Sequence, residues 1–262
     1  MMTQVREPAV AGYFYPADHS ELSTMINEML DEAPVRTGPA PKALIVPHAG
    51  YVYSGPVAAT AYSSLYPYRD QYTRVLMLGP GHRIAFQGLA SSGAELFRTP
   101  LGDVPLDRES IAALELPGVK LIDAMHQFEH SLEVHLPFLQ FVIGSFSLLP
   151  LVVGDTAPET VARVIDALWG GPETLIIVSS DLSHYLNYDE ARARDLETCK
   201  AIESMDAHGI DHGDACGATP LGGLLIAAKI RGMHVTKLDL RNSGDTAGGK
   251  GQVVGYGSWM LL

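Results

Sequence analysis

The stretch Lys42–Gly55, KALIVPHAGYVYSG, decides how the rest of this 262-residue chain is interpreted. Ala43–Val46 is a short aliphatic run typical of a buried strand, and Pro47 ends it because proline cannot donate a hydrogen bond to a sheet. The Gly55-Pro56 pair predicts the start of a helix that continues to Leu65. His48 therefore follows a strand end, which is where ligands bind in open α/β sheets.

The same arrangement of a strand followed by a histidine occurs twice more. Arg74–Leu78 predicts a strand that runs into Gly79-Pro80-Gly81-His82, and Thr174–Val178 predicts one that runs through Ser179 to His184. Further strands are predicted at Phe146–Val153, His234–Leu240 and Gln252–Leu262, and helices at Ser20–Glu32, Pro158–Leu168, Asp189–Met205 and Leu221–Ile230. This alternation predicts an α/β fold: a single domain, residues 1–262, with a central mixed sheet flanked by helices.

Charge and composition exclude several classes of protein. A formal net charge of −12 argues against nucleic-acid binding, which needs a surface rich in Lys and Arg. The apolar runs are too short to cross a bilayer, and the N-terminus lacks the regions of a signal peptide, so we expect a cytoplasmic protein with no membrane association. The two cysteines, Cys199 and Cys216, are expected to be free thiols.

His48, His82 and Cys216 form the sharpest candidate site. Two imidazoles at neighbouring strand ends can share a divalent transition metal, and a thiolate can complete three ligands while leaving open positions. Cys216 comes just before a predicted helix N-terminus, which would favour its deprotonated form. The alternative is that these histidines are ordinary polar loop residues.

A second candidate pair is Asp181 and His184. A carboxylate three residues before a histidine can hold one ring nitrogen and leave the other to act as general acid or base. The same Ser-Ser-Asp stretch is also a common helix N-cap, so both interpretations stay open.

The segment HSLEVH carries His130, Glu133 and His135. On a regular helix His130 and Glu133 share a face, whereas His135 lies about 140° round from His130, so the three cannot bind one metal ion. The spacing is neither H-E-x-x-H nor H-x-x-E-H, which argues against a zinc peptidase. Either these side chains are solvated or they form hydrogen bonds to the metal ligands, and we favour the second interpretation.

Six motifs, in order, resemble those of the Memo family, whose bacterial and archaeal members are called AmmeMemoRadiSam system protein B. They are REPAVAGYFYP at 6–16, PHAGYVYSG at 47–55, LGPGHR at 78–83, EHSLEVHLPFL at 129–139, SSDLSHY at 179–185 and CGATPLG at 216–222. The resemblance covers nearly the whole chain. It implies a fold similar to that of class III extradiol ring-cleaving dioxygenases, with the site at the edge of the sheet.

The resemblance also implies roles for individual residues. In those dioxygenases two histidines and a glutamate hold Fe(II), and another histidine is the acid/base. Carried over by motif, His48 and His82 are ligands, Cys216 replaces the carboxylate, and His184 is the acid/base. A thiolate suits iron or copper and can suit zinc, but it puts catechol cleavage in doubt. Tyr53 would line the pocket with the His130–His135 segment.

These observations give one main functional hypothesis and two alternatives. The main one is a metal-dependent, dioxygenase-like redox enzyme of unknown small-molecule or peptide substrate, with Fe(II) as the expected metal and copper or zinc as alternatives. The family name implies an AMMECR1-like domain protein and a radical SAM protein as partners. The first alternative is a non-catalytic module that binds a peptide or partner in the same pocket, and the second is a zinc hydrolase.

Overall fold

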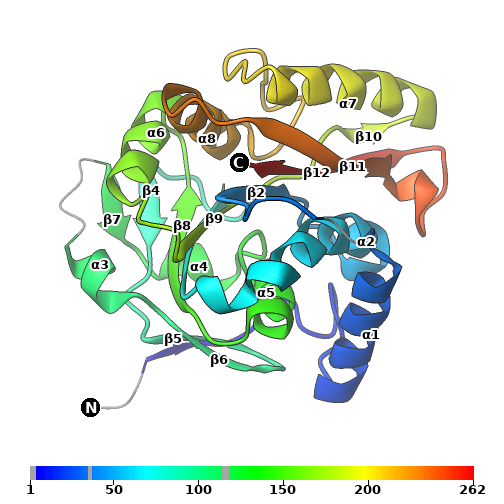
Figure 1. The fold of residues 1–262 in the computed structure, drawn as a ribbon. Helices are drawn as coiled ribbons and strands as arrows, with labels where there is room; N and C mark the ends of the chain where they lie inside the picture. The colour runs from blue at the N-terminus through cyan, green and yellow to red at the C-terminus, as the bar shows by residue number, and fades with distance from the viewer. Residues whose placement is uncertain (1–3, 35–36, 114–117) are drawn as a thin grey trace.

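The computed structural model describes residues 4–34, 37–113 and 118–262 and shows an α/β fold with a mixed sheet between helices (Figure 1). The large sheet has nine strands, of which eight lie in one path and β11 pairs with β12 alone. Along this path the strands are β10 (His184–Leu186), β12 (Val253–Leu261), β2 (Ala43–Val46), β9 (Thr174–Ser179), β3 (Arg74–Pro80), β8 (Ser147–Val153), β4 (Leu89–Ser91) and β7 (Val119–Leu121), and β11 covers Val235–Asn242.

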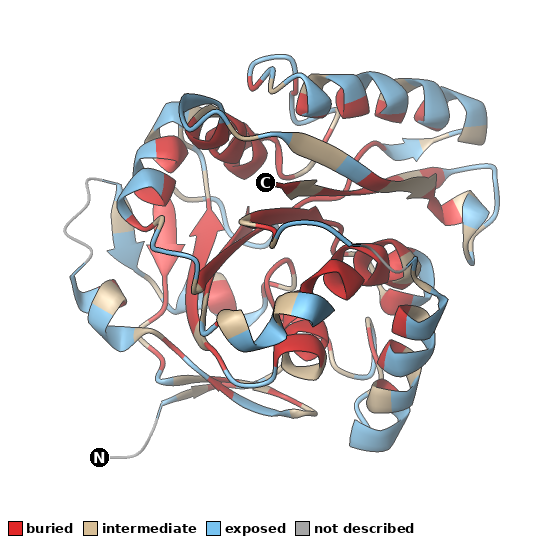
Figure 2. Cartoon of the chain, in the orientation of Figure 1, coloured by how far each residue is buried: buried red, intermediate tan, exposed pale blue. Residues whose placement is uncertain are grey.

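The centre of this sheet is parallel. β2, β9, β3 and β8 run in the same direction, with Val46 beside Ser179 and Leu78 beside Val178. Nearly every residue of these four strands is buried, because helices cover both faces (Figure 2). Their carboxyl ends therefore meet at one edge of the sheet, and the segments that follow β2, β3 and β9 lie close together there.

Helices form a layer on each side of the large sheet (Figure 1). α2 packs against β2, β11 and β12, whereas α8 packs against β3, β9 and α6 on the other side. The helices are α1 (His19–Glu32), α2 (Tyr51–Tyr62), α3 (Arg108–Ala112), α4 (Ala124–Gln127), α5 (Leu136–Ile143), α6 (Pro158–Ala167), α7 (Tyr188–Glu203) and α8 (Ala218–Ile230), with 3₁₀ turns at Ser63–Gln71, Glu133–His135 and Ser243–Asp245.

A smaller sheet holds the N-terminal segment. It has three strands in the order β1 (Val5–Arg6), β5 (Leu96–Thr99) and β6 (Gly102–Pro105). β1 pairs in parallel with β5, so residues near the start of the chain lie against a segment about 90 residues later. This contact leads the chain towards the carboxyl edge of the large sheet.

The predicted fold class is confirmed, and most predicted strands begin and end within two residues of the observed ones. The predicted start of the second helix at Gly55 is wrong, because α2 begins at Tyr51 and includes Pro56. The backbone N–H of Tyr51 donates to the carbonyl of Phe14, and its hydroxyl donates to the carbonyl of Val134, so tertiary contacts draw the preceding turn into the helix. In the part of the chain that the structure describes, no helix is long and apolar enough to span a membrane.

Candidate metal centre

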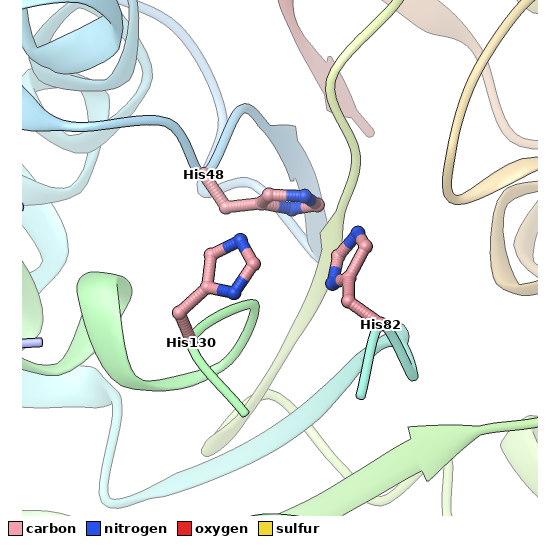
Figure 3. A group of neighbouring side chains, drawn as sticks. All are labelled: His48, His82 and His130. Atoms are coloured by element: carbon pink, nitrogen blue, oxygen red, sulfur yellow. The ribbon is translucent and has the colours of Figure 1, made fainter. Parts of the chain in front are cut away.

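Three histidines meet at the carboxyl edge of the sheet. His48 follows β2, His82 follows β3, and His130 lies in the turn after α4. Figure 3 shows their rings turned towards one common space. One ligand atom of each lies within 4.8 Å of those of the other two, and His48 is buried, His130 half-buried and His82 exposed. The group is therefore held from the interior and open to solvent on one side.

His48 is fixed by contacts to its backbone and to both ring nitrogens. Its N–H donates to Oδ1 of Asp181 over 2.7 Å. Its Nδ1 lies 2.5 Å from the hydroxyl of Ser179, and its Nε2 lies 3.3 Å from Sγ of Cys216. Burial, followed by the neighbouring histidines, holds the pKa of His48 well below its usual range, so its ring is neutral at pH 7.

His82 is held by one carboxylate. Glu129 accepts the backbone N–H of His82 over 2.6 Å and lies 2.9 Å from its Nδ1. Burial alone would raise the pKa of Glu129, but the hydrogen bonds from His82 and the backbone lower it to about 2. A charged carboxylate on Nδ1 leaves Nε2 as the free nitrogen of His82, which is the arrangement common at metal-binding histidines.

His130 carries a nitrogen without a hydrogen-bond partner. Its ring stacks on that of His82 at a centroid distance of 4.6 Å, and its buried Nδ1 has no hydrogen bond among the described residues. That nitrogen lies 3.3 Å from Oε1 of Glu129, without the alignment of a hydrogen bond. Burial lowers the pKa of His130 to about 4, so its ring too is neutral at pH 7. Neutral imidazoles with free nitrogens are the form that binds metal ions.

The structure corrects one prediction about Cys216, which lies beside His48. The backbone of Gly217, at the N-terminus of the helix that follows, lowers the pKa of the thiol, but burial outweighs this effect. Burial and then the charge of Asp181 raise the pKa of its thiol to about 12. Its Sγ lies near the end of β9, 3.3 Å from the backbone nitrogen of Asp181. Because burial penalises a lone negative charge, deprotonation at this position needs a cation next to the sulfur, and a bound metal ion would supply it.

The interpretations of Asp181 and His184 also change. Among the described residues, Asp181 accepts hydrogen bonds from the backbone N–H groups of His48 and Ala49 and none from the ring of His184. Burial raises the pKa of Asp181 to about 7. The chain continues from Asp181 into β10, so the helix-cap interpretation is wrong too. His184 is exposed, and it lies near enough to lower the pKa of His48.

The remaining predicted site residues lie at different depths. Tyr53 is 40% exposed, on the first turn of α2. Glu133 and His135 are buried, and the segment that carries them is a turn and a 3₁₀ helix, so the geometry of a regular helix does not apply. Glu133 accepts hydrogen bonds from Arg6, from the backbone of Ala9 and Val10, and from the hydroxyl of Tyr15.

Sequence reasoning missed two residues that hold the histidines, Glu129 and Ser179. Both stand inside motifs that the sequence analysis quoted, at the first position of EHSLEVH and of SSDLSHY. An acidic residue next to His130 was a usable signal for Glu129. Nothing in the sequence showed that it would hold His82, which is 47 residues away.

The fold and this site define a class: α/β proteins in which histidines cluster beyond the carboxyl ends of parallel strands. Residues 6–260 match the family model described as "Memo-like protein". Several curated relatives cover nearly the full chain, and each is described as a "MEMO1 family protein". The relatives from Methanosarcina acetivorans, Aeropyrum pernix and Aquifex aeolicus are each 36% identical to this chain. The alignments cover 97%, 97% and 99% of this chain, in that order. They cover 97%, 98% and 100% of the three relatives, in the same order. The chain therefore belongs to the Memo-like family.

A solved structure supports the fold independently of close sequence similarity. The uncharacterized protein JW3007 from Escherichia coli K12 aligns with a TM-score of 0.52 at 12% identity. The alignment covers 83% of this chain and 98% of that protein. At this level of identity the similarity concerns the fold alone.

Proposed function

We propose that this chain is a metal-dependent redox protein that uses His48, His82 and Cys216 to hold an iron or copper ion, with Fe(II) as the expected metal. The observation that carries the proposal is the group of three imidazoles around one space, with the Cys216 sulfur 3.3 Å from Nε2 of His48. Nitrogen and sulfur donors are those that borderline transition metals prefer, and metal–ligand bonds measure roughly 2.0–2.3 Å.

The residues present fit such an ion. The Nδ1 atoms of His48 and His82 are engaged by Ser179 and Glu129, so both Nε2 atoms are available as ligands. A bound iron or copper ion would supply one-electron chemistry and polarise a coordinated substrate. His184, exposed on the same side, would exchange a proton with the substrate. Asp181 would hold the backbone at His48.

Metal analysis of protein purified without oxygen tests the proposal and identifies the third ligand. Near-stoichiometric metal in the parent that is lost in His82→Ala supports a histidine-based centre. Loss in Cys216→Ala, with retention in Cys199→Ala, assigns the third position to the Cys216 thiolate, because Cys199 is the other free cysteine and lies in α7. Loss in His130→Ala with retention in Cys216→Ala assigns it to His130 instead. A parent that binds neither iron nor copper contradicts the proposal.

The redox part of the proposal requires a separate measurement. Metal-dependent oxygen consumption, or a reversible change of the metal's oxidation state, supports it. Zinc as the bound metal, with ester or amide hydrolysis that needs no oxygen, supports the zinc hydrolase instead. An AMMECR1-like domain protein and a radical SAM protein are the partners we propose, and co-purification with each of them tests that.

A binding module for a peptide or partner protein is the second candidate, and exposed apolar side chains near the site favour it. Tyr53, Ile84, Phe128 and Tyr185 are 40%, 44%, 60% and 72% exposed. Ile84 and Phe128 each lie two residues from a histidine of the cluster and line a cavity of about 450 Å³. Binding of an apolar peptide that is lost in Phe128→Ser but unchanged by a chelator would support this function over the metal-dependent one.

A further inference from the structure

The hydroxyl of Ser179 is shared by three neighbours. Its oxygen lies 2.5 Å from Nδ1 of His48, 2.8 Å from Nε2 of His135 and 2.6 Å from the carbonyl oxygen of Ser131. All four residues are buried. The donors and acceptors among them therefore have to match, because an unpaired polar group in the interior is destabilising.

Only one distribution of hydrogens satisfies all of these contacts. A carbonyl oxygen accepts only, so the single O–H of Ser179 donates to Ser131. The serine oxygen then accepts from both imidazoles. His48 therefore carries its hydrogen on Nδ1, and its Nε2 has a free lone pair that faces Cys216.

A buried tyrosine sets the tautomer of His135 from the other side. Nδ1 of His135 lies 2.8 Å from the hydroxyl of Tyr62, the last residue of α2. Burial lowers the pKa of His135 to about 3, so its ring is neutral and carries one N–H. With that hydrogen on Nε2, Nδ1 accepts the hydroxyl of Tyr62, and every group from Tyr62 to His48 is paired.

The opposite tautomer of His48 would break this pattern. If the Ser179 hydroxyl donated to Nδ1 of His48, the buried carbonyl of Ser131 would lose its 2.6 Å partner. Nε2 of His48 would then carry the hydrogen, and it could not bind a metal ion. The carbonyl would keep its contact with His135, but the Ser179 and Ser131 oxygens would face each other at 2.6 Å with no hydrogen between them, which disfavours this tautomer.

We infer that Ser179, His135 and Tyr62 are positioning residues that lock His48 in its Nδ1–H tautomer and so reserve Nε2 as a ligand. All three are buried, with at most 1% of each residue exposed. They act from the interior, through one serine oxygen. This role rests on the proposed metal function, but the tautomer exists without a metal and is measured without one.

Nitrogen NMR of the metal-free, reduced protein tests the inference directly. Long-range ¹H–¹⁵N correlation spectra distinguish protonated from unprotonated ring nitrogens. We expect His48 to be protonated at Nδ1 in the parent and to shift towards the Nε2–H form in Ser179→Ala. Ser179→Thr keeps a hydroxyl and is expected to restore the parent tautomer. An Nε2–H parent, or a Ser179→Ala variant with an unchanged His48, overturns the inference.

Tyr62→Phe and Tyr51→Phe form a matched pair if Ser179→Ala does not fold. Both tyrosines lie on α2, are buried, pack against Phe138 and donate one hydrogen bond. Only Tyr62 is connected to His48, so we expect Tyr62→Phe alone to populate a second tautomer of His135. Equal spectra for the two variants contradict the role of Tyr62.

Metal titration connects the tautomer to binding. We expect Ser179→Ala to weaken metal affinity about 10- to 100-fold, and Tyr51→Phe to leave it within about twofold of the parent. Unchanged affinity in Ser179→Ala, with a shifted His48 tautomer, contradicts the part of the inference that concerns the ligand. A parent without metal affinity refutes the proposed function, while the NMR result still decides the tautomer.

Discussion

Replacing Arg6 by methionine tests whether a buried ion pair holds the N-terminal segment against the site. The Arg6 guanidinium pairs with Glu133, and their side chains are 6% and 0% exposed. Arg6 also donates to the carbonyls of His126 and Glu129 over 3.0 and 2.7 Å. Methionine keeps much of the apolar volume of the side chain but leaves the carboxylate of Glu133 buried without its cation.

The magnitude follows from this burial. Removing one partner of a buried ion pair costs about 3–5 kcal/mol, because the remaining charge cannot reach water. An unfolding entropy of roughly 2.1 cal/mol/K per residue gives about 0.55 kcal/mol/K for 262 residues, so Tm should fall by about 5–9 °C. Urea unfolding at pH 7, followed by two probes whose transitions coincide, measures the free energy.

Arg98→Met is the matched control, and a double mutant isolates the pair. Arg98 pairs with Asp103 and Glu7, but its side chain is 43% exposed and water screens these pairs, so its loss should cost far less stability than the loss of Arg6. Arg6→Met combined with Glu133→Gln should cost less than the sum of the two single changes. If Arg6→Met and Arg98→Met destabilise the protein equally, the reasoning about this pair is refuted.

Three further predictions concern pH, affinity and packing. Burial lowers the pKa of His126 to about 4, so the unfolded chain binds more protons than the folded chain between pH 4 and 6.5, and the free energy of unfolding falls as the pH drops. His126→Gln should remove about 2 kcal/mol of this loss at pH 5. Urea midpoints of the variant that shift between pH 7.5 and 5 as much as those of the parent would contradict this prediction. Glu129→Gln should weaken metal affinity about 10- to 100-fold in a competition titration, whereas the surface change Glu173→Gln should leave it unaltered. A Cβ on Gly217 would lie 2.6 Å from the carbonyl oxygen of Ser179, so Gly217→Ala should lower the free energy of unfolding by about 1–3 kcal/mol in urea. Gly249→Ala is the control, because no atom lies within 4 Å of a Cβ at that position. Equal stability of the two variants would count against this explanation.

The strand-end motifs predicted much of the site because they depend on local chemistry. A buried aliphatic run, ended by proline or glycine and followed by histidine, places His48 and His82 beyond β2 and β3 wherever these strands lie in the sheet. The parallel order of β2, β9 and β3 then brings their ends together. For these two residues, local pattern and tertiary structure agree.

The sequence failed where a side chain's partner is distant in the chain. One of the two interpretations left open had Asp181 hold His184, three residues away, but Asp181 accepts from the backbone of His48, which is 133 residues away. His130 and His135 were placed by helical geometry, whereas the chain forms a turn and a 3₁₀ helix there. Local spacing cannot predict such contacts, because buried polar groups take whichever partner the packing brings within reach.

By itself, the sequence determined the α/β class, the four strands of the parallel centre and the histidines that follow β2 and β3, because each follows from hydrophobic periodicity and from residues that end a strand. Only the tertiary structure decided how the buried donors and acceptors pair: Glu129 on His82, Glu133 on Arg6, and Ser179 between His48 and His135. The physical reason is that hydrogen bonding is directional and short in range, so the pairing depends on positions to within a few tenths of an ångström. Such positions are set by the packing of the whole core.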